Sequence, residues 1–267
     1  MMEVGNDPKV WQRFTPTERI GRSIVYVLTA VAVVWSLRTI EIIPEFLADA
    51  PQQSYDLFQR MWPFDFKFWP LVQTTMIETF HIATLGTMLA IMMALPLAFL
   101  AARNFTPNPL LRWVAQFIFV ASRSVNSLIW ALLFVAIFGP GALAGVLSIA
   151  VRSIGFVGKL FGEALEEAQP GPIEALTAAG APRASILLKG YWPQAEPAFW
   201  SVALLRWDIN IRESAVLGLV GAGGIGVALD AAMNNLYWNQ VGLILAVIFA
   251  VVIMTEIVTS SIRRRII

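Results

Sequence analysis

The chain of 267 residues contains no cysteine and one histidine, and only 14% of its residues are charged. Without cysteine it has no disulfide bonds, no thiolate nucleophile and no cysteine-ligated zinc or iron–sulfur site. One histidine leaves no partner for a two-histidine metal motif, so we expect neither a metal site nor a catalytic residue set. The formal net charge of +1 provides no global field to hold nucleic acid. Soluble domains are about 25% charged, so this composition, 57% hydrophobic, predicts a membrane protein.

Long apolar segments recur along the chain. A membrane-spanning helix needs about 20 predominantly apolar residues. One such segment, between Arg112 and Val151, is interrupted by Arg123 and divided into two helices by the turn Gly139-Pro140-Gly141. The others are residues 24–43, 82–102, 195–220 and 240–261. The sequence therefore predicts an all-α integral membrane protein with six transmembrane helices.

Lysine and arginine are distributed unevenly between the connecting segments. Residues 44–70, the Gly139-Pro140-Gly141 turn and residues 221–239 contain only Arg60 and Lys67. The segments that alternate with them carry twelve such residues: Lys9, Arg13, Arg19, Arg22, Arg103, Arg112, Lys159, Arg183, Lys189, Arg263, Arg264 and Arg265. Cytoplasmic loops of membrane proteins carry the excess of lysine and arginine. We therefore expect both termini in the cytoplasm.

The segment before the first apolar run is long and mostly polar. A cleavable signal has a short charged region, an apolar region and then a cleavage site of small residues, and no such site follows the first run here. We expect residues 1–23 to be a cytoplasmic segment and residues 24–267 to form a single transmembrane domain, with its first helix retained.

Five arginines lie within or beside the expected spans, where a charge costs several kcal/mol unless it is paired or hydrated. One interpretation is a set of salt bridges within a single helix, since Asp208 and Arg212 are spaced i,i+4 and Arg206 and Glu213 lie nearby. Arg38 and Arg152 fit a different role, in which a long side chain extends along the helix to reach the membrane interface.

A second interpretation of the same charges is a polar path for an anion. In this hypothesis Arg123, Arg206 and Arg212 line a cavity, with Asn126 and Asn210 as hydrogen-bonding groups. The sequence leaves both interpretations open.

The connection over about residues 163–194 is long, and a long loop in a compact membrane protein indicates a function. Residues 174–179 are strongly helix-forming, Gly180 suits a left-handed C-terminal stop, and Pro182 suits the first turn of a second helix. The pattern predicts a helix-turn-helix projecting into the cytoplasm.

This connection resembles the EAA loop of permease subunits of bacterial ABC importers. Glu174, Ala175, Gly180 and Pro193 match the family pattern in type and spacing. Three positions depart from it: Leu176 replaces an alanine, and Gly190 and Trp192 stand where isoleucine and leucine are usual. The resemblance implies a type I importer permease, in which the loop, with Pro182 in its turn, docks into a separate ATPase subunit and transmits its closure to the membrane helices.

Longer strings resemble the phosphonate and phosphite branch of these permeases. They are residues 123–130 (RSVNSLIW), 138–145 (FGPGALAG) and 210–226 (NIRESAVLGLVGAGGIG). Because related permeases for methionine share a glycine-rich segment of this kind, phosphonate, phosphite, hypophosphite, phosphate and methionine all stay open as substrates. The resemblance further implies a bacterial inner-membrane location and these partners: a second copy of the chain, two ATPase subunits that use ATP and Mg²⁺, a periplasmic binding protein and membrane lipid.

The glycines at the end of the fifth span formally match a dinucleotide-binding fingerprint, G-x-G-x-x-G. That fingerprint requires a preceding strand and a following crossover helix, whereas this segment follows a membrane span. We expect Gly221, Gly223, Gly224 and Gly226 to form a tight re-entrant turn, buried against neighbouring helices or facing the pore. The chain has no Walker A sequence, so we expect it to bind no cofactor and to depend on its partner for ATP hydrolysis.

Two other function classes compete with a permease of this kind. A secondary transporter, which needs no ATPase, would show inverted repeats or paired broken helices between two halves, and no such repeat is evident. A membrane enzyme would need a nucleophile–base pair, a metal cluster or facing catalytic carboxylates. The single histidine and the lack of cysteine argue against an enzyme.

Overall fold

The apolar segments form long helices. A computed structural model of the chain describes residues 16–40 and 43–266, and every regular element within these ranges is helical. Internal contacts divide the chain into two units, Met1–Asp56 and Leu57–Ile267. The all-α prediction is therefore confirmed for the described part of the chain. Most of the expected cytoplasmic segment 1–23, including Lys9 and Arg13, lies outside it.

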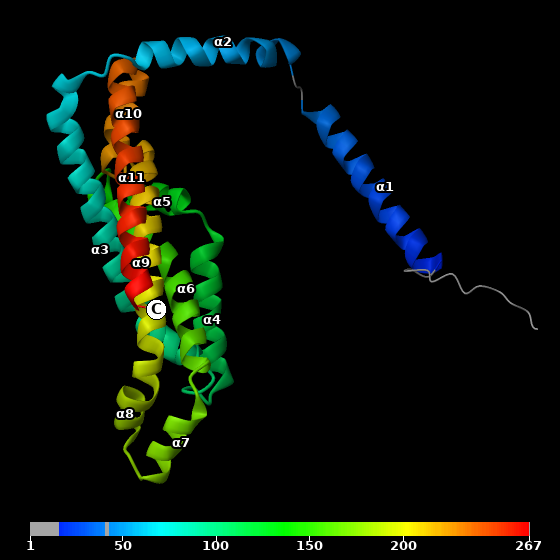
Figure 1. The fold of residues 1–267 in the computed structure, drawn as a ribbon, viewed down its shortest axis with the longest axis vertical. Coiled ribbons are helices and arrows are strands. Elements are labelled where there is room, and N and C mark those ends of the chain that lie inside the picture. The colour runs from blue at the N-terminus through cyan, green and yellow to red at the C-terminus, as the bar shows by residue number, and fades with distance from the viewer. Residues whose placement is uncertain (1–15, 41–42, 267) are drawn as a thin grey trace, which may run out of the picture. The chain divides into compact units, whose positions relative to one another are not determined.

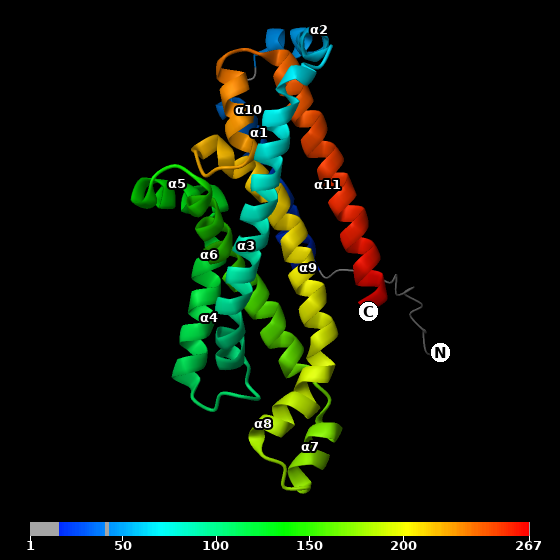
Figure 2. The ribbon, with the colours of Figure 1, turned by 90° about the vertical axis from the view of Figure 1, so that its left-hand side faces the viewer.

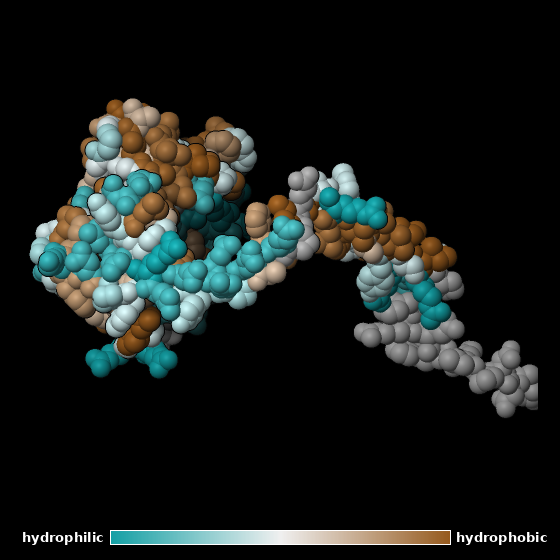
Figure 3. All heavy atoms as spheres, turned by 90° about the horizontal axis from the view of Figure 1, so that it is seen from above, coloured by the Kyte–Doolittle hydropathy of each residue, from teal (hydrophilic) through white to brown (hydrophobic). Residues whose placement is uncertain are grey.

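The first unit contains α1 (Pro16–Thr39) and most of α2 (Pro44–Met61). The α1 helix is long and apolar enough to cross a membrane. Its hydrophobic surface is brown at the right of Figure 3. It begins and ends a few residues before the expected span 24–43. The α2 helix is amphipathic, because residues such as Phe46, Leu47 and Phe58 alternate at helical spacing with acidic residues and glutamines.

The second unit is a helical bundle. Its elements are η1 (Phe66–Phe68), α3 (Trp69–Ala101), α4 (Pro109–Ser124), α5 (Ser127–Phe138), α6 (Ala142–Glu166), α7 (Pro170–Ala178), α8 (Arg183–Ile186), η2 (Leu187–Tyr191), α9 (Trp192–Leu217), η3 (Gly218–Val220), α10 (Ile225–Asn234) and α11 (Trp238–Ile266). Figures 1 and 2 show α3, α4, α6, α9 and α11 running along the long axis in alternating directions, whereas α5 lies across it. The α7 and α8 helices extend past one end of this bundle.

Four helices are long and apolar enough to span a membrane, and there are up to six spans in the described residues if each of two bent helix pairs is one span. The α3 and α11 helices are longer than the expected spans 82–102 and 240–261, because polar turns continue each helix. The expectation of one continuous third helix is wrong: α4 and α5 meet at an angle of 91°. The break has a local cause, since Val125 and Asn126 are extended and Asn126 caps α5 by accepting a hydrogen bond from the Leu128 N–H.

The bundle is held together by close packing of small residues. The buried face of α3 repeats small side chains at helical spacing, among them Ala83, Gly86, Ala90 and Ala94. A Cβ on Gly86 would lie 2.7 Å from Ile149 of α6. Without a hydrophobic effect between helices in lipid, such close approach is the main source of packing energy.

The GxxxG patterns at Gly141–Gly145 and Gly158–Gly162 also serve packing within the chain. A Cβ on Gly145 would come within 2.4 Å of the Ala222 carbonyl oxygen, and one on Gly158 within 2.3 Å of the Phe119 ring. Gly141 itself, with φ of 145°, lies in the turn between α5 and α6. The predicted Gly139-Pro140-Gly141 break between two helices is confirmed.

The connections of the second unit separate into two groups. In Figures 1 and 2 the α3–α4 connection and the α7–α8 segment lie at one end of the bundle, and the α5–α6 turn and α10 lie toward the other. The basic connections that the sequence assigns to one side of the membrane, carrying Arg103, Arg183 and Lys189, therefore share one end of this unit.

Candidate functional site

The α9 helix carries five polar or charged side chains in eight residues, inside the bundle. Arg206, Asp208 and Asn210 are 5%, 4% and 0% exposed. The helix packs against both α3 and α6, and small residues on those helices let it approach closely. Charges at such positions are costly in a membrane protein unless they are paired, so their partners are informative.

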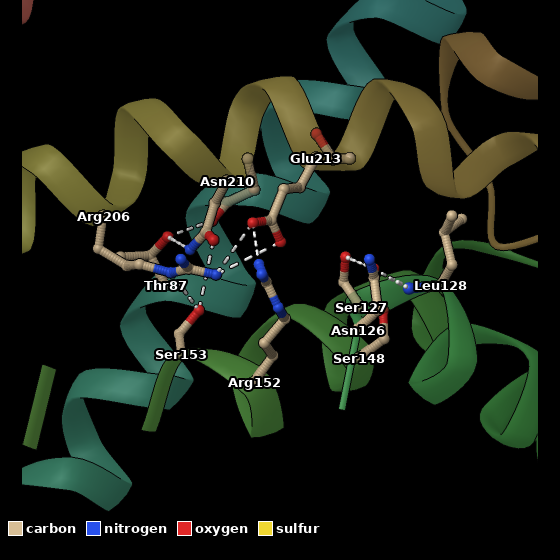
Figure 4. Close-up of polar contacts among 12 residues, drawn as sticks. Thr87, Asn126, Ser127, Leu128, Ser148, Arg152, Ser153, Arg206, Asn210 and Glu213 are labelled. Carbon is tan, nitrogen blue, oxygen red and sulfur yellow. Dashed lines mark hydrogen bonds and ion pairs between the residues drawn. The ribbon is translucent and has the colours of Figure 1, made fainter. Parts of the chain in front are cut away.

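Two arginines from different helices share one carboxylate. The Arg206 guanidinium donates to Glu213 at 3.3 Å through Nη2, and to Ser153 Oγ at 2.8 Å through Nε. Arg152 of α6 makes an ion pair with the same Glu213 carboxylate. Figure 4 shows both guanidinium groups reaching the Glu213 carboxylate, that of Arg206 from the left and that of Arg152 from below. With one carboxylate for two guanidinium groups, the cluster has a net positive charge, which is the electrostatic requirement for holding an anion.

Asn210 links three helices through hydrogen bonds. Its Nδ2 donates to Thr87 Oγ1 of α3 at 2.7 Å, and its Oδ1 accepts from Ser153 Oγ of α6 at 3.3 Å. A hydrogen bond of this kind contributes about 1 kcal/mol net. Removing one partner costs more, because the other is left buried without a partner. The network therefore fixes α9 against α3 and α6 at the level of the arginines.

Arg212 lies at the border of this cluster. It pairs with Asp208 one turn earlier, and its Nη1 lies 3.7 Å from Glu256 Oε2 of α11. Its side chain is 40% exposed, whereas that of Asp208 is 5% exposed. Asp208 Oδ1 and Arg152 Nε are buried and have no hydrogen-bond partner among residues 16–40 and 43–266. Buried polar atoms without partners are rare, and here one belongs to the Asp208–Arg212 pair and the other to the Arg152–Glu213 pair.

The predicted salt bridge Asp208–Arg212 is present, and so is an ion pair between Arg206 and Glu213 on the same helix. The interpretation of Arg152 as a side chain reaching for the membrane interface is wrong. Its helix, α6, is packed against α9 at this level, so the guanidinium pairs inside the bundle. The sequence pattern had not indicated that Arg152 meets the α9 charges.

Arg123 and Asn126 lie apart from the hydrogen-bonded cluster around Arg206. Arg123 is exposed in the last turn of α4, where the helix dipole favours a cation. It lines a cavity to which none of Arg206, Asn210 and Arg212 contributes. Asn126 is the N-cap of α5. The structure thus brings three of the five predicted path residues together on α9.

Sequence reasoning missed Thr87 and Ser153. Both are small hydroxyl residues inside apolar helices, where such residues commonly bond their own backbone, and Thr87 does so with the Ala83 carbonyl at 2.6 Å. Only the tertiary structure distinguishes them from many similar residues.

The predicted helix-turn-helix is present at the end of the bundle that α7 and α8 extend. The α7 helix contains Glu174 and Ala175, both exposed, and ends in a Schellman motif: the Gly180 N–H donates to the Thr177 carbonyl and the Ala181 N–H to the Leu176 carbonyl. Gly180 has φ of 72°, as its predicted role as a left-handed stop requires. Pro182 is the N-cap of α8 and does not lie inside its first turn.

The second helix of this motif is continuous with a membrane helix. After one turn of α8, the chain forms a π-helical turn, η2, and continues into α9, with Pro193 in the first turn. The side chain of Gln194 joins the start of α9 to the start of α7. Its Nε2 donates to the Gly190 carbonyl at 2.7 Å, and its Oε1 accepts from the Gln169 N–H at 2.8 Å. The exposed turn is therefore joined through helical backbone to the helix that carries Arg206 and Arg212.

Two departures from the EAA pattern compensate each other in space. The place where a Cβ of Gly190 would lie is 3.3 Å from Leu176 Cδ1 and 3.4 Å from Ile173 Cγ1. The larger residue on α7, leucine instead of alanine, fills the space that a large side chain at position 190 would occupy. The two helices therefore still pack together, with the large side chain at position 176 and the small residue at position 190.

The glycine-rich segment forms a tight, buried turn between α9 and α10. Gly221, Gly223 and Gly224 have φ between 78° and 82°, a region that other residues rarely adopt. The Gly141 N–H donates to the Gly221 carbonyl at 2.9 Å, and a Cβ on Gly226 would lie 2.4 Å from the Ala215 carbonyl oxygen. The expected tight turn against neighbouring helices is present at Gly221, Gly223 and Gly224, whereas Gly226 lies in the first turn of α10.

The family model described as "Binding-protein-dependent transport system inner membrane component" matches residues 86–265. The chain is 42% identical over 189 residues to the phosphite transport system permease protein PtxC of Stutzerimonas stutzeri, covering 71% of this chain and 69% of that protein. It is 36% identical to the putative phosphite transport system permease protein HtxC of the same species, over 90% of this chain and 84% of that one.

A third relative is the phosphate-import permease protein PhnE of Mycolicibacterium smegmatis, 39% identical over 87% of this chain. The chain spans 44% of that protein's length. Among solved structures, an inward-facing MetNI methionine ABC transporter matches with a TM-score of 0.66 at 22% identity, over 76% of this chain and all of that one. At this identity the likeness concerns the fold, which is that of an ABC importer permease. The chain belongs to the family of binding-protein-dependent transport system inner membrane components.

Proposed function

We propose that the chain is the transmembrane subunit of an ATP-driven importer that moves a small phosphorus oxyanion across the bacterial inner membrane. The observation that carries the proposal is the similarity to phosphite and phosphate permeases, at 36–42% identity. Phosphonate, phosphite, hypophosphite and phosphate belong to this substrate class. Methionine is the alternative, but the methionine permeases among the relatives are 28% identical.

The assembly that we propose contains two copies of this chain, two ATPase subunits and a periplasmic binding protein, in membrane lipid and without nucleic acid. The chain itself performs no chemistry and holds no cofactor, and the ATPase subunits use ATP and Mg²⁺. Residues 24–267 act as one permease domain, with the coupling loop at about 163–194. The family description, which names a binding-protein-dependent system, supports the presence of a binding protein in the assembly.

In the mechanism that we propose, the helix-turn-helix couples ATP hydrolysis to transport. The ATPase contacts the exposed residues around Glu174, Ala175 and Gly180, and the turn at Pro182 transmits the displacement. Because α8, η2 and α9 form one helical path past Pro193, a movement of the loop is carried along α9. The helices then expose the anion path alternately to each side of the membrane.

The anion path that we propose includes Arg206, Asn210 and Arg212, with Arg123 and Asn126 nearer the break between α4 and α5. Guanidinium groups bind phosphorus oxyanions through paired, charge-assisted hydrogen bonds. The two guanidinium groups that share the Glu213 carboxylate, and the buried Arg152 Nε donor without a partner in the described residues, support this assignment. Gly221, Gly223, Gly224 and Gly226 form the turn that closes the path at the end of α9.

The substrate class is tested by uptake into proteoliposomes that contain the complete transporter. With binding protein outside and ATP inside, we expect phosphite or phosphate uptake that stops when ATP is omitted. Competition by phosphite, phosphate, methylphosphonate, hypophosphite and methionine identifies the substrate within the class. Competition by methionine, with none by any phosphorus oxyanion, would contradict the proposal.

The orientation is tested with single cysteines, which the cysteine-free chain makes unambiguous. We propose that both termini and α7 face the cytoplasm. Cysteine at Gln52, exposed on α2, will react with a membrane-impermeant maleimide in intact spheroplasts. Cysteine at Thr177, exposed on α7, will react only after permeabilisation. The reverse pattern would overturn the six-span arrangement with both termini inside.

A further inference from the structure

A charged cavity lies between α4 and α6, beside the end of α3. Its volume is about 310 Å³, at the lower end of the range of about 300–1,000 Å³ that is typical of small-ligand pockets. Three basic side chains line it: Arg103 after α3, Arg123 of α4 and Lys159 of α6. Val120, also in the lining, is exposed and apolar. None of these residues belongs to the hydrogen-bonded cluster around Arg206.

The two carboxylates that line the cavity are already engaged. Glu166 Oε1 accepts a hydrogen bond from the backbone N–H of Arg103 at 2.7 Å, and Glu163 pairs with Lys159 at 3.5 Å. Among the residues that the structure describes, the guanidinium groups of Arg103 and Arg123 form no ion pair. The lining therefore has three cations against two anions, and its two arginines have free donors.

Free arginine donors in this position favour an anionic ligand. Arg123 belongs to the α4–α5 pair, which is apolar enough to lie in the membrane, and there an unpaired charge is costly. Guanidinium groups match the geometry of phosphate-type oxygens with paired hydrogen bonds. Basic pockets between transmembrane helices also bind the head groups of anionic lipids.

We propose that this cavity is a second anion site, which binds a phosphate-type group through Arg103, Arg123 and Lys159. The group is either a free phosphorus oxyanion or the phosphate of a lipid head group with net negative charge, and the chemistry of recognition is the same. The first source deepens the proposed function, on which it rests, whereas the second is independent of it.

The experiment measures protection of a cysteine placed in the cavity. Val120→Cys, in the otherwise cysteine-free chain, provides one reactive thiol in the lining, and Gln116→Cys is a second probe if the first variant folds poorly. The complete transporter is placed in nanodiscs without ATP, and alkylation by N-ethylmaleimide is timed. Two lipid mixtures are compared, phosphatidylcholine alone and phosphatidylcholine with phosphatidylglycerol, each with and without added inorganic phosphate or phosphite.

We expect alkylation to slow about tenfold when the site is occupied. Slowing by phosphate or phosphite in phosphatidylcholine identifies the free oxyanion as the ligand, whereas slowing by phosphatidylglycerol alone identifies the lipid. Adding Arg103→Gln and Arg123→Gln to the probe will remove the protection, because each change deletes charge-assisted hydrogen bonds. Adding Arg112→Gln, on α4 but outside the cavity lining, will not.

The proposed site is wrong if neither oxyanions nor phosphatidylglycerol slow alkylation, or if protection persists in the Arg103→Gln/Arg123→Gln background. Because the assay uses no ATP and no transport, its result separates from that of the uptake test. If phosphite is taken up but the cysteine is not protected, only the proposal of this second site is contradicted. If lipid protects the cysteine but no phosphorus oxyanion is taken up, only the proposed substrate is contradicted.

Discussion

Glu174→Ala and Gly180→Val will each lower ATP-driven uptake by on the order of 5- to 150-fold, the fold-change that corresponds to a typical coupling free energy between two sites. Both variants will leave the chain inserted and folded. Glu174 is exposed on α7 and makes no hydrogen bond or ion pair within the described residues, so removing it costs little stability. Valine at position 180 strains a backbone with φ of 72°, by about 1–2 kcal/mol or more for a β-branched residue, and shifts the turn.

Uptake and ATPase activity of the reconstituted transporter check this prediction, with membrane yield measured in parallel. Matched controls outside the proposed coupling loop are Asp49→Ala, an exposed carboxylate on α2, and Gly21→Ala, an exposed glycine of α1 with open space around it. Normal uptake and substrate-stimulated ATPase activity in both loop variants would exclude a coupling role for this segment.

The second large effect concerns the arginines that share Glu213. Glu213→Leu alone will reduce folded yield, because it leaves two guanidinium groups without their carboxylate, at a cost of about 3–5 kcal/mol. Replacing all three charges, as Arg152→Met, Arg206→Met and Glu213→Leu, will restore the yield, since apolar residues of similar volume often replace buried ion clusters without loss of stability. Uptake will nevertheless stay at least about tenfold below wild type, because the path has lost Arg206 and the neighbouring charge of Arg152.

Folded yield by size-exclusion chromatography and uptake at matched protein levels distinguish the two roles of this cluster. The smaller pair offers the same comparison: Arg212→Met with Asp208→Leu is expected to fold and to carry little substrate. Arg123→Met alone should also fail in uptake. Wild-type uptake in the apolar triple variant and in Arg123→Met would leave these arginines as structural elements and remove the anion path.

The helices could be predicted from the sequence because their signal is local. Each local signal depends on the backbone conformation or on the solvent around one segment. The structure has helices at the apolar runs, a break at Gly139-Pro140-Gly141 and a helix end at Gly180. The break between α4 and α5 was missed. Its cue, Asn126 as an N-cap, is also local, but the apolar residues on either side suggest one continuous helix.

The candidate site was only partly predictable, because partners distant in sequence define it. The pair Asp208–Arg212 follows from i,i+4 spacing on one helix. The ion pair between Arg152 and Glu213 joins residues 61 positions apart, and no periodicity relates them. Thr87 and Asn210 are further apart still, and their hydrogen bond depends on how α3 and α9 cross.

The sequence by itself determined that this chain is a helical membrane protein, because apolar run length and charge content describe how each segment partitions between water and lipid. It also determined the helix-turn-helix formed by α7 and α8, since Gly180 and the flanking helix formers act over a few residues. Only the tertiary structure decided which charges meet. Inside a bilayer every buried charge needs a partner, and the packing of α3, α6 and α9 through their small residues selects Glu213 as the partner of both Arg152 and Arg206.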